Sequence, residues 1–161
     1  MQLRTAHGLQ AADGALREGV MLEHPVASSG DVGPARPKTE GDPRVPRILV
    51  IDDDAAIREL LRFVLEEEGY QVIEAANGAE GLQWYQAEPT DLVITDLHMP
   101  GMEGLALLEA LRRVVPTPAL MAISGDQEAL TQAKRFTPHT FAKPLPLEQV
   151  LEAVRTLALR H

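Results

Sequence analysis

Short apolar runs alternate with segments of helical hydrophobic spacing along most of this 161-residue chain. The runs predict strands at 48–51, 70–74, 92–96, 119–123 and 140–142. After each run, apolar residues recur at intervals of three and four, which predicts five helices. Parallel strands need crossover connections, which these helices provide. The alternation therefore predicts an α/β fold, a doubly wound five-stranded parallel sheet with helices on both faces.

Several residues mark the expected helix boundaries and packing. Gly69 is expected to close the first helix. Trp84 and Tyr85 are expected to pack their helix against the sheet. Leu105, Leu108, Leu111 and Val115 share the spacing of one helix after the central strand.

Polar residues follow the apolar runs at the point where each expected strand ends. They are Asp52-Asp53-Asp54, Asp96, Ser124 and Lys143. The carboxyl ends of parallel strands meet at one edge of a sheet, where open α/β folds bind their ligands. Carboxylates gathered there repel one another, at a cost of about 4 kcal/mol per pair at 4 Å and an effective dielectric near 20. A hard divalent cation such as Mg²⁺ relieves this repulsion and leaves room for a phosphate oxygen.

Four motifs in register give residues 47–161 a resemblance to the receiver domain of two-component response regulators, as in chemotaxis regulators. They are the acidic pair in ILVIDDD, Asp96 in ITDLHMPGMEG, Ser124 in MAISG and Lys143-Pro144 in FAKPL. This resemblance implies a flavodoxin-like strand order of 2-1-3-4-5. It also implies a phosphoprotein of the phosphorelay signal transduction class rather than a conventional enzyme, one that promotes its own phosphorylation and dephosphorylation.

The resemblance further implies a role for each motif residue. Asp96 is the expected phosphoacceptor, Ser124 the switch hydroxyl and Lys143 the phosphoryl contact. The expected Mg²⁺ ligands are Asp52, Asp53, Asp96 and the backbone carbonyl of His98. A cis peptide is implied at Lys143–Pro144.

Two departures from the usual receiver pattern concern the output switch. Thr140 stands three residues before Lys143, where many receivers carry an aromatic residue. Phe141 follows it, and strand alternation predicts that its side chain turns to the other face of the sheet. The segment from Ser124 to Lys143 is also short, which predicts an abbreviated fourth helix.

Composition excludes several other classes of protein. The formal charge of −9 argues against a nucleic-acid surface, and the absence of cysteine excludes disulfides and thiolate chemistry. No apolar stretch approaches the roughly 20 residues that span a bilayer, and the N-terminus lacks the apolar core of a signal peptide. We therefore expect a cytoplasmic protein with no membrane partner.

Residues 1–46 are rich in Gly, Pro, Ser and charge, so we expect a disordered N-terminal extension before a receiver domain at 47–161. An alternative is that Met21 is the true start. The chain ends just after the fifth expected helix, which predicts a stand-alone receiver that signals through protein–protein contacts. Its expected partners are a histidine kinase or histidine phosphotransfer protein and a downstream protein. We expect a monomer or a phosphorylation-dependent dimer.

Two alternative functions fit parts of the sequence. Haloacid-dehalogenase-like phosphatases use a strand-end Asp as nucleophile, a role that Asp52 would take in the D-x-D pattern of 52–54. However, Ala56 stands where that family prefers Thr or Val, the late acidic pair is missing, and Asp96 would have no role. The second alternative is a non-phosphorylated docking module, which would not need the complete set of motif residues.

Overall fold

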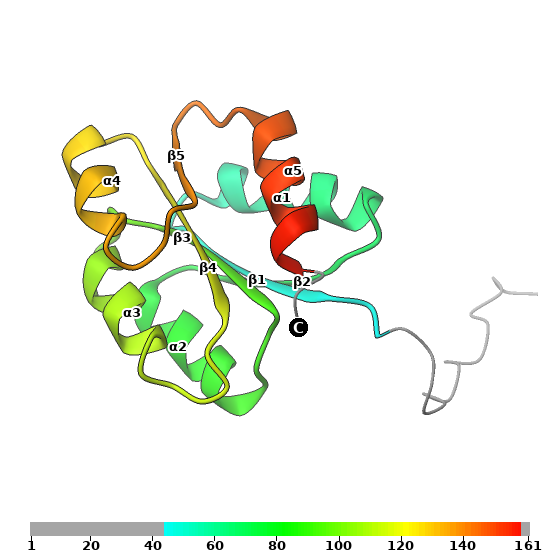
Figure 1. Ribbon diagram of the computed structural model, residues 1–161, viewed down its shortest axis with the longest axis horizontal. Helices are drawn as coiled ribbons and strands as arrows, with labels where there is room; N and C mark the ends of the chain where they lie inside the picture. The colour runs from blue at the N-terminus through cyan, green and yellow to red at the C-terminus, as the bar shows by residue number, and fades with distance from the viewer. Residues whose placement is uncertain (1–43, 159–161) are drawn as a thin grey trace, which may run out of the picture. The chain divides into compact units, whose positions relative to one another are not determined.

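The structure, a computed structural model, describes residues 44–158 as alternating strands and helices around one sheet (Figure 1). Its five parallel strands lie in the order β2-β1-β3-β4-β5. The strands are β1 (Arg47–Ile51), β2 (Gln71–Ala75), β3 (Leu92–Asp96), β4 (Ala119–Ser124) and β5 (Thr140–Ala142). The helices are α1 (Ala55–Glu67), α2 (Gly78–Ala87), α3 (Gly104–Leu111), α4 (Gln127–Ala133) and α5 (Leu147–Ala158). The predicted fold class and strand order are confirmed.

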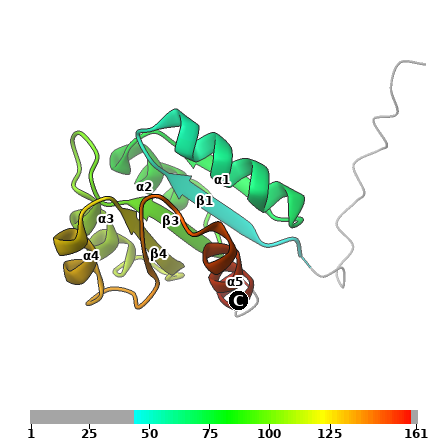
Figure 2. The same ribbon diagram turned by 90° about the horizontal axis from the view of Figure 1, so that it is seen from above.

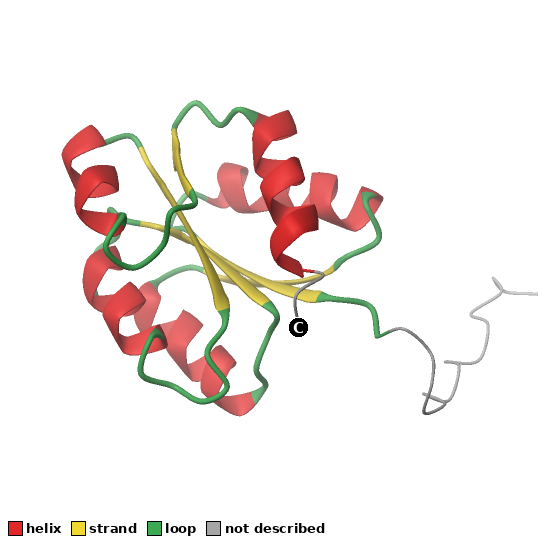
Figure 3. Cartoon of the chain, viewed as in Figure 1, coloured by secondary structure: helices red, strands yellow, loops and turns green. Residues whose placement is uncertain are grey.

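Alternation along the strands builds two cores, one on each face of the sheet. Figure 3 shows the sheet with helices on both sides of it. Leu49, Ile51 and Val93 face α2, α3 and α4, whereas their neighbours Ile48 and Val50 face α1 and α5. Figure 2 shows α1 running alongside β1 on the second face. Because β1, β3 and β4 are buried on both faces, they carry runs of consecutive apolar residues instead of an apolar–polar alternation.

Short polar side chains begin three of the helices close to the strand ends. Asp54 accepts a hydrogen bond from the backbone N–H of Ala56 at the start of α1. Asn77 and Asp126 cap α2 and α4 in the same way. These caps fix where the chain leaves each strand, which holds the polar residues of the strand ends at one edge of the sheet.

Local features agree with several predictions from the sequence. Gly69 follows α1 with a φ of 90°, the left-handed conformation that favours glycine after a helix. The fourth helix is short, at seven residues. Phe141 packs with the α1 and α5 core and Ala142 with the opposite core, as strand alternation requires. The Lys143–Pro144 peptide is cis, and so is Val115–Pro116.

The predicted extent of the third helix was wrong, and the predicted packing of Trp84 and Tyr85 is confirmed for Tyr85 alone. The third helix ends at Leu111, and Val115 lies beyond it with 93% of its surface exposed. Pro116 disfavours the helical conformation of the residue before it, Val115. Val114 and Val115 are also β-branched, which lowers their preference for a helix, so α3 stops early. Trp84 is 46% exposed on α2, whereas Tyr85 is buried and donates a hydrogen bond to the carbonyl of Pro116.

The predicted extension at 1–46 lies almost wholly outside the residues that the structure describes, as do residues 159–161. Of that extension only residues 44–46 are described, leading directly into β1. Across residues 44–158, no helix combines the length and apolar character that crossing a membrane requires.

Candidate functional site

Three aspartates meet at the carboxyl edge of the sheet. Asp52 and Asp53 follow β1 directly, and Asp96 ends the neighbouring strand β3. Each offers a carboxylate oxygen, and these oxygens lie within 4.8 Å of one another. Asp52 and Asp96 are buried and Asp53 is exposed, so the cluster is open to solvent on one side. The sequence prediction that these side chains converge is confirmed.

Hydrogen bonds hold Asp52 on all sides. Its carboxylate accepts a bond of 2.9 Å from the backbone N–H of Asp54 and one of 2.8 Å from Lys143 Nζ. Its own backbone N–H donates to the carbonyl of Ala75 on β2, at 3.2 Å. Each carboxylate oxygen of Asp52 therefore accepts a hydrogen bond, which fixes the orientation of this side chain.

Lys143 brings positive charge to the two buried carboxylates. Its Nζ also lies 3.5 Å from Asp96 Oδ1. Burial by itself lowers the pKa of Lys143, but its hydrogen bond to Asp52 and the charges of Asp52 and Asp96 outweigh this and raise that pKa overall. The lysine therefore stays protonated and offsets part of the repulsion between the carboxylates.

The surroundings of Asp96 raise the pKa of its carboxyl group. Burial raises its pKa first and the charge of Asp52 raises it further, whereas Lys143 and the backbone N–H groups of His98 and Leu97 lower it less. The net shift is upward from an ordinary value of 3.8. Without a cation, the folded protein thus holds an ionised Asp96 at a free-energy cost.

Ser124 ends β4 beside this cluster, where β4 pairs with β3. Its side chain is buried, and its Oγ accepts a hydrogen bond of 3.0 Å from the backbone N–H of Asp126. His98 Nδ1 lies 3.5 Å from the same oxygen, and the His98 ring is 65% exposed. The Ser124 hydroxyl and His98 Nδ1 therefore lie within hydrogen-bond distance, and the tautomer of the imidazole ring decides which of the two donates.

The donor set fits a hard divalent cation. Three carboxylate oxygens within 4.8 Å of one another, two of them buried, are oxygen ligands of the kind that Mg²⁺ prefers. Lys143 completes a site with positive charge on one side and acidic ligands on the other. Such an arrangement holds the oxygens of a phosphoryl group and neutralises its charge during transfer.

The sequence model of one protein family, described as the response regulator receiver domain, matches residues 48–155 of this chain. The chain belongs to the response regulator receiver domain family. This receiver domain is 34% identical over 116 residues to sporulation initiation phosphotransferase F of Bacillus subtilis, an alignment covering 68% of this chain and 90% of that protein. Receiver domains are signalling modules rather than conventional enzymes, so the match agrees with the sequence prediction.

Two further relatives show how far the likeness extends. Response regulator protein TrrA of Thermotoga maritima, solved in complex with Mg²⁺ and BeF, is 31% identical with a TM-score of 0.66, covering 70% of this chain and 99% of that one. Transcriptional regulatory protein ResD of Bacillus subtilis is 36% identical over 117 residues, or 71% of this chain. The receiver domain spans 48% of ResD, so that likeness concerns about half of the relative.

Sequence reasoning missed two contributors to the site of the receiver domain. Arg58 of α1 donates a hydrogen bond of 2.7 Å to the backbone carbonyl of Asp52. Gly104 begins α3 against the backbone of Asp96 and Leu97. Gly104 follows Pro100 and Gly101, so the sequence pattern indicates only a loop there. Arg58 lies in an amphipathic helix, where the pattern indicates only a solvent-exposed residue.

Metal-free Asp96→Asn should be more stable than the wild-type receiver domain at neutral pH. The unfolded wild-type chain ionises Asp96 near 3.8, whereas the folded state does so at a higher pKa. The contribution of Asp96 to the free energy of unfolding is therefore fully present below pH 3.8, and it is lost as the pH rises through the pKa of the folded state. Urea unfolding in EDTA across this range checks the prediction, since the stability difference should grow with pH. A constant difference would contradict it.

Proposed function

We propose that this receiver domain accepts a phosphoryl group on Asp96 and signals through protein–protein contacts. The observation that carries the proposal is the Asp52, Asp53 and Asp96 cluster beside Lys143 at the carboxyl edge of the sheet. Asp52, Asp53 and Asp96, with the backbone carbonyl of His98, would hold Mg²⁺. When bound, Mg²⁺ supplies positive charge that stabilises the oxygens of the transferring group.

The chain's own residues account for the remaining chemistry. An Asp96 carboxylate oxygen attacks phosphorus, forming an acyl phosphate as the bond between phosphorus and the donor nitrogen of a phosphohistidine breaks. Lys143 Nζ, which stands 3.5 Å from Asp96 Oδ1, pairs with a phosphoryl oxygen. The Ser124 hydroxyl donates to another. Water later attacks phosphorus, which breaks the bond between phosphorus and the Asp96 oxygen, releases inorganic phosphate and restores the carboxylate.

The partners follow from this chemistry. A histidine kinase or a histidine phosphotransfer protein would supply the phosphoryl group, and a downstream protein would bind the phosphorylated form. Sporulation initiation phosphotransferase F is a relative whose name describes phosphotransfer. We propose that the receiver acts in the cytoplasm, as a monomer or as a dimer formed on phosphorylation.

The test of this function is labelling by acetyl phosphate, a small phosphoryl donor. With Mg²⁺ the receiver domain should gain one phosphoryl group, visible as one added mass in the intact protein. EDTA should prevent the gain, since the carboxylates then lack the cation. Labelling that persists in EDTA would contradict the proposed role of the acidic cluster.

Hydrolysis of p-nitrophenyl phosphate separates this proposal from the phosphatase alternative. A phosphatase with Asp52 as nucleophile would turn this substrate over steadily. The receiver domain should not, because Asp52 already accepts hydrogen bonds on both carboxylate oxygens. Steady turnover lost in Asp52→Asn would support the phosphatase instead.

A further inference from the structure

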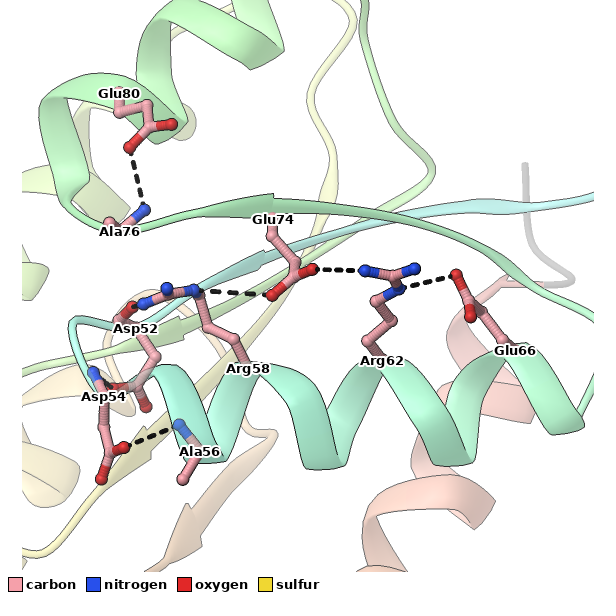
Figure 4. A network of polar contacts seen from close by, with 9 residues as sticks. All are labelled: Asp52, Asp54, Ala56, Arg58, Arg62, Glu66, Glu74, Ala76 and Glu80. Atoms are coloured by element: carbon pink, nitrogen blue, oxygen red, sulfur yellow. Dashed lines mark hydrogen bonds and ion pairs between the residues drawn. The ribbon is translucent and has the colours of Figure 1, made fainter.

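A chain of charged side chains joins α1 and β2 behind the acidic cluster (Figure 4). We name Arg58, Arg62, Glu66 and Glu74 the α1–β2 network. Glu74 of β2 pairs with Arg58 Nε at 3.5 Å and with Arg62 Nη1 at 3.2 Å. Arg62 also bonds to Glu66, one helical turn along α1, at 3.1 Å.

One end of this network reaches the candidate site. Arg58 Nη1 donates a hydrogen bond of 2.7 Å to the backbone carbonyl of Asp52. The side chains of Arg58 and Glu74 are only 18% and 27% exposed, and Asp52 is fully buried. A charged donor gives a stronger hydrogen bond than a neutral one, and partial burial protects it from competing water.

The position of this carbonyl determines where Asp53 points. The Asp52 oxygen belongs to the planar peptide group that joins Asp52 to Asp53. Its orientation therefore sets the backbone direction of Asp53, the exposed member of the cluster. The side chain of Asp52 is held separately by Asp54 N–H and Lys143. Arg58 thus supplies the constraint on the peptide between the two acids.

We propose that Arg58, held by Glu74, is a positioning residue that orients the Asp52–Asp53 pair for the divalent cation. This inference rests on the proposed function. The direction in which cation affinity changes when Arg58 is replaced distinguishes this positioning role from a purely electrostatic effect of its charge. A guanidinium near the cluster repels a cation, so removing its charge alone would tighten cation binding. Removing its positioning role loosens binding instead.

The test measures Mg²⁺ affinity from the backbone amide shifts of the full chain during an NMR titration. Arg58→Met keeps the aliphatic stem and removes both the donor and the charge. Its Mg²⁺ Kd should rise about tenfold, the scale on which outer-shell partners act on metal sites. Arg62→Met is the matched control, because Arg62 lies on the same helix and pairs with the same Glu74 without contacting Asp52. Its Kd should stay near the wild-type value.

Arg58→Lys is a second variant, which keeps the inference testable if Arg58→Met does not fold. It keeps the positive charge, yet one ammonium cannot hold the Asp52 carbonyl and Glu74 with the geometry of a guanidinium. Its Mg²⁺ Kd should rise, by less than in Arg58→Met. An unchanged or lower Kd in folded Arg58→Met, or a wild-type Kd in Arg58→Lys, would overturn the inference. Failure of the wild type itself to bind Mg²⁺ would instead overturn the proposed function.

Discussion

Asp96→Asn is expected to reduce phosphoryl labelling by acetyl phosphate and Mg²⁺ to background. The proposed nucleophile is the carboxylate of Asp96, and an amide of the same shape carries no negative charge to attack phosphorus. Asn would also remove one carboxylate oxygen from the proposed cation site. Asp96 is 3% exposed at the end of β3, so the substitution keeps the packing of the strand almost unchanged. Intact-protein mass spectrometry measures the loss.

Asp126→Asn is the matched control for this experiment. Asp126 follows Ser124 closely and is an exposed acid that caps α4. Asn caps helices about as well as Asp, so the change removes a nearby charge while keeping the helix start. Labelling should continue in this variant. Equal labelling of Asp96→Asn and Asp126→Asn would show that Asp96 is not the acceptor.

Gly104→Ala should destabilise the domain by about 3 kcal/mol, at the upper end of the usual cost of overpacking. A Cβ on this residue would lie 2.4 Å from Leu97 Cα and 2.5 Å from the carbonyl oxygen of Asp96. Both are backbone atoms, so no side chain can rotate away to make room. The Asp96–Leu97 segment itself must move, and phosphoryl labelling should fall along with stability. Urea unfolding measures the first effect.

Gly125→Ala is the control at a neighbouring loop. Gly125 directly follows Ser124, but a Cβ there would meet nothing within 4 Å. Its stability should stay within about 0.5 kcal/mol of the wild type, as for an ordinary exposed position. A Gly104→Ala protein as stable as Gly125→Ala would mean that the loop after Asp96 yields easily, contrary to this account.

The sequence predicted the fold well because each strand of the sheet carries its own signal. Ile48 to Ile51 is wholly apolar because β1 is buried on both faces, and Asp52 follows where the strand must end. The register of the parallel sheet then brings Asp52, Asp96 and Lys143 to one edge. Periodicity and strand-end chemistry therefore sufficed for the main features of the candidate site.

The errors have two kinds of cause, a local effect that helical spacing does not reveal in α3 and tertiary contacts elsewhere. Val115 continued a helical pattern, yet α3 stops at Leu111 before the Val115–Pro116 segment. Trp84 and Tyr85 are adjacent in sequence, but only Tyr85 points into the core, where its hydroxyl reaches the Pro116 carbonyl. The contact from Arg58 to Asp52 joins a helix to a strand end, and no spacing rule distinguishes that arginine from Arg62.

A crystal structure with Mg²⁺ and beryllofluoride, which mimics a phosphoryl group, tests the central claim most directly. We predict beryllium bonded to an Asp96 carboxylate oxygen, with fluorides facing Ser124 Oγ and Lys143 Nζ. Mg²⁺ should lie among Asp52, Asp53 and Asp96. Beryllofluoride bonded to Asp52 would contradict the assignment of Asp96 as phosphoacceptor and favour the phosphatase chemistry.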